Sequence, residues 1–389
     1  MIIAATAWHV LSAALIFFAG LVLSLVFAKK IRLSQKHALV LYLWHTFFSM
    51  AYLLYSLSSV ADSTLYYINS LTQAGGFKPG TLFVDFFTGI FTKTLGVSYL
   101  GAFLVYNAIG SIGLLSFASA VRTAVDGKSR HMRRLGWVVL LLPSVSFWSG
   151  AIGKDAISFM SACLFLWCVL ELRRRMGWMV FAIISMLLVR PHMAALMVFA
   201  VAAGIIFTRG SSVPARILLG LVAAVGTVVV VPFALQFAGL GDVQAAVDVA
   251  DYVEQRQGYN QEGGGAIDIS RMSPPVQLFT YLYRPLPYEA HSATSLAASV
   301  ENVGLIFLTV LAGWRLFRTH AGFFDFLKSN LVLMFYAGGS WVVLAMTTAN
   351  LGIAARQKWM FAPILLYLAL SVLGGVTRYN EKSRRRAIR

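Results

Sequence analysis

The chain opens with MIIAATAWHVLSAALIFFAGLVLSLVFAKKIR (residues 1–32), and this stretch decides the fold class. Its apolar run has the length of a membrane-spanning helix, about 20 residues. The basic residues Lys29, Lys30 and Arg32 follow the run. A secretory signal peptide would instead carry a basic segment before the run and a small-residue cleavage site after it. We therefore expect a retained first transmembrane helix over 8–28, with the N-terminus outside.

The composition of the whole chain agrees with this start. Hydrophobic residues make up 59% of the 389 residues and charged residues only 12%, whereas soluble domains have about 25% charged residues. Apolar stretches recur along the chain without period-2 alternation, which favours helices over a barrel. The sequence thus predicts an all-α fold, a polytopic transmembrane bundle forming a single domain over 1–389. We expect eleven spans, near 8–28, 38–58, 97–121, 135–149, 156–172, 177–189, 193–208, 217–239, 301–314, 329–348 and 359–376.

The distribution of Lys and Arg predicts the orientation of the spans. Of the 32 Lys and Arg residues, 23 fall in alternate connections, and such connections are typically cytoplasmic. This predicts a cytoplasmic C-terminus and accounts for the net charge of +17 without nucleic acid as a partner. The basic connections are 29–37, 122–134, 173–176, 209–216, 315–328 and 377–389.

The longer connections fall on the opposite, outer side, at 59–96 and 240–300. Within the first of them, TLFVDFFTGIFTKTLG (81–96) spaces its apolar residues as an amphipathic helix lying in the membrane interface would. Cys163 and Cys168 lie five residues apart in one apolar segment, a spacing that does not place them on one helix face. We expect them to pack as small apolar residues without a disulfide.

Ionisable residues at or near spans are costly in a membrane and are therefore candidates for function. Asp62 in VADSTLYYINS is a candidate base or acid; alternatively it caps the helix that follows. Lys154 and Asp155 follow a bend marked by Pro, Trp, Ser and Gly, and they are candidates for binding a polar head group and for catalysis, respectively. The alternative is a local ion pair in which Asp155 caps the next helix.

Three further segments place cations on the outer side. Arg190 and His192 flank Pro191, which breaks the helix, and an arginine fork suits phosphate oxygens; alternatively Arg190 snorkels to lipid phosphate. In the segment YRPLPYEAHS, two prolines fix the backbone between the cation Arg284 and the carboxylate Glu289; the alternative is a loop plug. Glu301 is expected at the start of the ninth span. The last segment, NLGIAARQK, concentrates the donors Arg356, Gln357 and Lys358, or is an ordinary outer loop.

Together these residues form the minimum set for transferring a sugar from a polyprenyl-linked donor. Cations would hold the phosphates and stabilise the leaving group, and a carboxylate among Asp62, Asp155 and Glu289 would deprotonate the acceptor hydroxyl. The chain contains no GxxxxGK[ST], HExxH or GxSxG motif and no Cys/His metal spacing, so we expect neither a metal nor a cofactor.

The layout resembles polytopic GT-C-type glycosyltransferases and Wzy-like polysaccharide repeat-unit polymerases. The resemblance is carried by VADSTLYYINS, by the stretch from GTLFVDFFTG onward, and by LLPSVSFWSGAIGKDAISF, RPLPYEA and NLGIAARQK. It implies a lipid-linked saccharide donor, an active site facing the periplasm or exterior, and Asp62 as the catalytic carboxylate of the first outer loop. The paired acidic motif of GT-C enzymes is absent, because Ser63 and Thr64 follow Asp62.

The sequence therefore predicts a multi-pass glycosyltransferase or polymerase of the bacterial inner membrane. Its partners would be a polyprenyl-phosphate or polyprenyl-diphosphate sugar donor, a saccharide acceptor and membrane lipid, and its product a cell-surface polysaccharide. One alternative is a transporter or flippase of lipid-linked saccharide. Such a protein should carry ionisable groups in the middle of its spans, and no acidic residue falls there. The other alternative is a non-catalytic membrane subunit of a polysaccharide export system.

Overall fold

The computed structural model describes residues 3–59, 61–72, 76–207, 220, 265–269, 271–318 and 320–374. Over these residues the fold is helical, with one isolated β-bridge between Ala266 and Asn350. The expected span 217–239, apart from residue 220, lies outside the described residues, as do residues 240–264 of the second outer connection and the basic tail.

Several apolar helices give the chain the character of a membrane protein. Four of them are long and apolar enough to cross a bilayer: α1 (Ala7–Lys30), α2 (Gln35–Ser58), α5 (Tyr99–Val125) and α14 (Ala293–Arg318). Shorter apolar helices are α9 (Met176–Val189), α10 (Pro191–Phe207), α16 (Leu331–Thr347) and α18 (Ala362–Val372). Large apolar side chains project outward from these helices, including Val22 of α1, Leu54 of α2 and Phe307 of α14. Such a surface is suited to contact with lipid.

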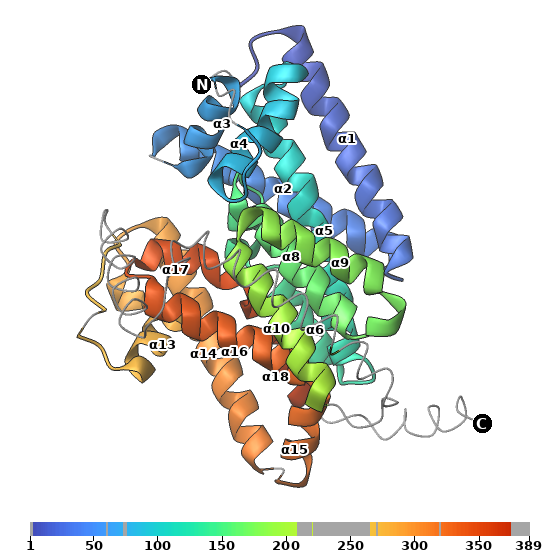
Figure 1. Ribbon diagram of the computed structural model, residues 1–389, viewed down its shortest axis with the longest axis vertical. Coiled ribbons are helices and arrows are strands. Elements are labelled where there is room, and N and C mark those ends of the chain that lie inside the picture. The colour runs from blue at the N-terminus through green and yellow to red at the C-terminus, as the bar shows by residue number, and fades with distance from the viewer. Residues whose placement is uncertain are drawn as a thin grey trace.

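Helix α5 lies at the centre of the bundle. Its most apolar window is 83% buried, against 28% for that of α1. Helix α5 packs against α1, α2 and α8 (Lys154–Val169), and α8 in turn packs against α9 (Figure 1). Nearly every residue of α8 is buried, which explains why its sequence is apolar on all sides. Both cysteines lie in α8 as free, buried thiols, which confirms the expectation of no disulfide.

Two predicted spans have different boundaries in the structure. The span expected over 135–149 is interrupted, because α6 (Arg130–Leu140) ends before Pro143 and α7 (Pro143–Ser149) begins there. A proline disfavours helical backbone at the preceding residue, and Leu142 is accordingly extended with ψ 122°. The ninth span was predicted to start at Glu301, but α14 begins at Ala293. The Ala- and Leu-containing segment before Glu301 continues the helix, so this carboxylate lies in the third turn.

The first outer connection is largely helical. It contains α3 (Asp62–Thr72) and α4 (Thr81–Gly89), which continues as a π-helix over Ile90–Thr94. Helices α3 and α4 pack on each other beside α2 and α5 (Figure 1). The helix expected from TLFVDFFTGIFTKTLG is therefore present, whereas its placement in a membrane interface stays a prediction. The remaining elements are η2 (Leu172–Arg174), α13 (Pro274–Tyr283), η3 (Pro287–Glu289), α15 (His320–Ser329), α17 (Leu351–Gln357) and η4 (Lys358–Met360).

A buried polar cluster joins three helices below the outer connection. His45 of α2 is fully buried; its Nδ1 lies 2.6 Å from Asn107 Oδ1 of α5, and its Nε2 lies 2.9 Å from Ser149 Oγ of α7. The Asn107 amide donates to Thr46 Oγ1 at 2.8 Å. The ring of His45 thus joins α2 to α5 and to Ser149, the last residue of α7.

We predict that Asn107→Leu lowers stability, because it leaves His45 and Thr46 without their amide partner in the core. The expected loss is about 1–2 kcal/mol, the range of hydrogen bonds between membrane helices. The measurement is the thermal unfolding midpoint of purified protein in detergent. The control is Ser111→Ala, since the Ser111 hydroxyl donates only to the Asn107 backbone carbonyl within α5. Equal midpoints for the two variants would show that the cluster carries no stability.

Candidate active site

Five ionisable side chains from distant parts of the chain line one small pocket: Asp62, Lys154, Asp155, Arg190 and Arg356. The sequence singled out all five as candidates, and the fold brings them together. The pocket has a volume of about 20 Å³, which is room for roughly one water molecule. In this closed form the polar groups contact one another, so a ligand must displace some of these contacts.

Breaks in the helices position these side chains. Asp62 is the first residue of α3, and Lys154 and Asp155 form the first turn of α8. Gly153 precedes them with φ 153°, backbone that favours glycine. Arg190 lies between α9 and α10 with φ −146° and ψ 78°, directly before Pro191. Each functional group therefore lies where a helix starts or stops, at the same end of the bundle.

Asp155 lies between two guanidinium groups. Its Oδ1 is 2.5 Å from Arg190 Nη2, and its Oδ2 is 3.8 Å from Arg356 Nε. Arg356 also donates a hydrogen bond to Asp62 Oδ2. The Asp155 side chain is 19% exposed and that of Asp62 is 51% exposed. Asp155 is thus the inner carboxylate that holds the two arginines, and Asp62 is the outer one.

The arginines retain unused donors in this arrangement. The Nε atoms of Arg190 and Arg356 are both buried and have no hydrogen-bond partner among the described residues. Lys154 adds a third cation, and its ammonium donates to Thr81 Oγ1 of α4 at 3.0 Å. Three cations and two carboxylates leave the pocket with a net positive charge, so it attracts anions.

Aromatic side chains border the charged groups: Tyr52, Tyr66 and Trp148 line the same pocket. Burial raises the pKa of the Tyr66 phenol, with the neighbouring charge of Asp62 as a smaller cause, so this hydroxyl stays protonated. Trp148 and Tyr52 pack edge to face with ring centroids 5.6 Å apart. The sequence does not distinguish these aromatic residues as part of a site, because residues of this type are spread throughout the chain.

A further carboxylate, Asp85 of α4, lies apart from the pocket lining. Burial raises its pKa, opposed by a hydrogen bond to Asn69 and by the charge of Lys154. Its Oδ1 is buried and has no partner in the described structure. The sequence shows that Asp85 interrupts an apolar stretch, but only the structure shows that the Asp85 carboxylate is buried.

The remaining predicted site residues do not line this pocket. Arg284 and Glu289 bind each other through a bidentate contact, in which Arg284 Nε lies 2.8 Å from Glu289 Oε1. They are part of the ordered segment that includes η3, so the loop-plug alternative describes them better than a shared phosphate site.

The other three predicted site residues lie elsewhere. His192 is in the first turn of α10, and Gln357 ends α17. Lys358 is 2% exposed and donates to Asn302 Oδ1 of α14.

The alternative of a local ion pair between Lys154 and Asp155 does not agree with the structure. Adjacent residues at a helix start project in different directions, and Asp155 faces Arg190 whereas Lys154 faces Thr81.

Comparison of the chain with protein-family models, with curated proteins and with solved structures finds no match. The geometry of the pocket therefore carries the functional argument.

We predict strong energetic coupling between Asp155 and Arg190. Replacing either residue alone, as in Asp155→Leu or Arg190→Met, removes the nearest partner of the other charge and should cost about 3–5 kcal/mol. The double variant removes both charges and should cost clearly less than the sum of the two single variants. The measurement is a double-mutant cycle of unfolding free energies in detergent, with the exposed pair Arg271 and Asp268 as control. Additive losses at the buried pair would contradict the coupling.

The contact between Arg284 and Glu289 predicts that the local stability of residues 284–289 depends on pH. The hydrogen bond from Arg284 lowers the pKa of Glu289 below its ordinary value of 4.5. The contact therefore contributes its full stabilisation above pH 4.5, and this stabilisation is lost as the pH falls through the lowered pKa of Glu289. The protection factors of the backbone amides of Arg284, Leu286, Tyr288 and Glu289 against hydrogen exchange should fall in that acidic range. Glu289→Gln should remove the transition, and a transition that persists in this variant would assign it to another group.

Proposed function

We propose that this chain is an integral-membrane glycosyltransferase or repeat-unit polymerase of the bacterial inner membrane. Its donor would be a polyprenyl-diphosphate-linked saccharide and its product a cell-surface polysaccharide. One observation carries the proposal: Arg190 and Arg356, 166 positions apart in the printed sequence, meet at the same carboxylate beside Asp62. A pocket with three cations, two carboxylates and an aromatic border matches a sugar attached to a diphosphate.

The cations act on the diphosphate. A planar guanidinium offers parallel donors to two oxygens of a phosphate, as it does to a carboxylate. In the closed pocket the carboxylate of Asp62 occupies a position on Arg356 that a phosphate oxygen would take. Negative charge develops on the leaving diphosphate as the glycosidic bond breaks, and fixed cations stabilise that charge without reorganising.

The two aspartates take different roles in this proposal. Asp155 is only 19% exposed and serves to orient Arg190 and Arg356. Asp62 is half exposed at the pocket mouth and is the base. It accepts the proton of the acceptor hydroxyl, whose oxygen bonds to the anomeric carbon as the bond from that carbon to the diphosphate breaks. Of the three carboxylates considered from the sequence, Glu289 is occupied elsewhere by Arg284.

Donor binding and base activation are linked in this arrangement. Arg356 contacts Asp62 in the closed pocket. A diphosphate that binds Arg356 competes with this contact and releases the Asp62 carboxylate for proton transfer. The exchange replaces one anion by another on the same guanidinium, so the cost of displacing the carboxylate is offset by the new pair. It also explains why so small a pocket can accept a larger ligand.

We predict that Arg190→Ala and Arg356→Ala each lower transfer at least about a hundredfold, the size of effect seen when a stabilising donor is removed. Asp62→Asn should likewise abolish transfer, because an amide cannot accept the proton. The measurement uses purified protein in liposomes with a polyprenyl-diphosphate oligosaccharide and an acceptor. The matched control is Arg174→Ala, an arginine with a 79% exposed side chain beyond the opposite end of α8.

The products separate the candidate functions. Longer chains indicate a polymerase and one added sugar indicates a single-sugar transferase. Relocation of the lipid-linked saccharide across the bilayer without a new bond indicates a flippase. Normal product from folded Arg190→Ala and Arg356→Ala proteins would rule out the proposed mechanism.

A further inference from the structure

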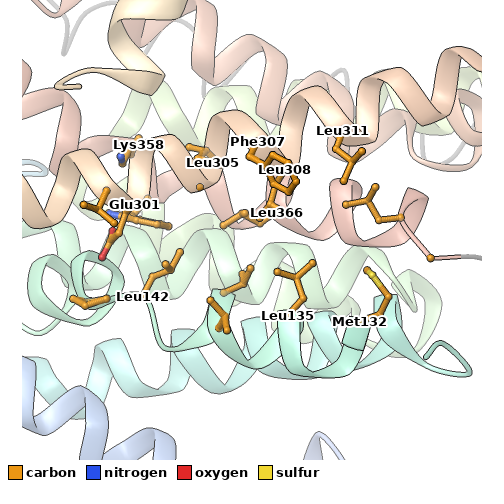
Figure 2. A pocket seen from close by; sticks show the side chains of 18 of the residues that line it. Met132, Leu135, Leu142, Glu301, Leu305, Phe307, Leu308, Leu311, Lys358 and Leu366 are labelled. Carbon is orange, nitrogen blue, oxygen red and sulfur yellow. The ribbon is translucent and has the colours of Figure 1, made fainter. Parts of the chain in front are cut away.

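A long apolar groove runs along the side of the bundle, apart from the ion-pair pocket. It is lined by α6, α14 and α18, has a volume of about 810 Å³, and its wall includes Leu135, Leu308 and Leu366 (Figure 2). Figure 2 shows Glu301 and Lys358 at one end and Met132 and Leu311 toward the other. The lining along α14 runs from Ala297 to Arg315, so the groove is about 27 Å long at 1.5 Å per residue. This shape fits an extended hydrocarbon chain.

The end of the groove at Glu301 is polar and incompletely hydrogen-bonded. Glu301 Oε1 accepts from the Ser144 backbone N–H at 2.9 Å. Its Oε2 has no partner among the described residues, and neither has Nε1 of Trp359, a side chain that is 3% exposed. One free acceptor and one free donor therefore belong to two residues that line the groove, and Trp359 directly follows Lys358 in the chain.

Lys358 completes this polar end. Its buried ammonium donates to Asn302 Oδ1, and the Asn302 amide in turn donates to the Pro285 carbonyl at 3.0 Å. An ammonium has three donors, and no described carboxylate is in direct ion-pair contact with this one. Glu301 and Lys358 thus offer opposite charges that do not touch each other.

The charges at this end select the head group of a ligand. A phosphate would meet the carboxylate of Glu301, and a quaternary ammonium would meet the cation Lys358; each like-charge contact in an apolar site is costly. An uncharged hydroxyl meets neither penalty. Its oxygen accepts from Lys358 or Trp359, and its proton is donated to Glu301 Oε2.

We propose that the groove binds a lipid that has a long hydrocarbon chain and an uncharged, hydroxyl-bearing head. The chain lies along α14 and the hydroxyl lies at Glu301, Lys358 and Trp359. The proposal does not depend on the glycosyltransferase function, because the groove shares no lining residue with the ion-pair pocket.

Native mass spectrometry of the full-length protein in detergent tests the head-group selection. The probes are 1-hexadecanol, hexadecyl phosphate and hexadecyltrimethylammonium, which share one chain. At equal concentrations we expect at least fivefold more hexadecanol than either charged probe to stay bound. Glu301→Gln should reduce hexadecanol retention several-fold, because the amide offers a weaker acceptor to the hydroxyl proton.

Two glycine variants on α14 test the location. Gly304 lines the groove and a Cβ there would meet open space, so Gly304→Phe is expected to place its ring in the groove. Gly313 also has open space but does not line the groove, so Gly313→Phe is the matched control. We expect the first variant to lose hexadecanol and the second to retain it, with equal unfolding midpoints.

Three results would overturn the proposal. Preferred retention of hexadecyl phosphate would assign the groove to an anionic lipid held by Lys358. Equal retention by the two glycine variants would mean that bound hexadecanol lies elsewhere on the apolar surface. No retention of any probe by the unmodified protein would mean that the groove is not a lipid site.

Discussion

The contact of one carboxylate with two guanidinium groups is the constraint on which the pocket end of this bundle depends. Charges removed from water are stable only when they are paired. Asp155 of α8 is paired with Arg190, in the break between α9 and α10, and approaches Arg356 of α17. Three segments that are far apart in the sequence are thereby held together at one point. Asp62 of α3 is joined to them through Arg356.

The same contact connects structure to the proposed chemistry. A guanidinium that is already oriented by a carboxylate needs little rearrangement to receive a phosphate oxygen. The pocket is nearly filled by its own charged groups, so its anion-binding capacity is occupied internally until a ligand competes. The difference in exposure between Asp155 and Asp62 separates a residue that orients cations from one that can reach a substrate.

The two polar regions differ in charge balance and in access. The ion-pair pocket is narrow and carries more cations than carboxylates, whereas the groove is wide, apolar, and ends in one carboxylate and one ammonium. Helix α7 begins at Pro143 in the groove lining and ends next to Trp148 of the pocket and the buried His45 cluster. The break before Pro143 therefore decides the boundary of both regions.

The sequence by itself determined the helical class and the membrane character, and it placed the five pocket residues among its ten candidates, because apolar length and the cost of isolated charges are local properties. It did not determine which cation meets which carboxylate. Arg190, Arg284 and Arg356 look alike in the sequence, yet Arg284 is bound by a carboxylate five positions away while the other two meet at Asp155. Glu301 looked like a helix start, but it lies inside α14 at the end of a groove made by three helices. Pairing across the bundle and the shape of cavities depend on how helices far apart in the chain pack together, and only the tertiary structure decides that.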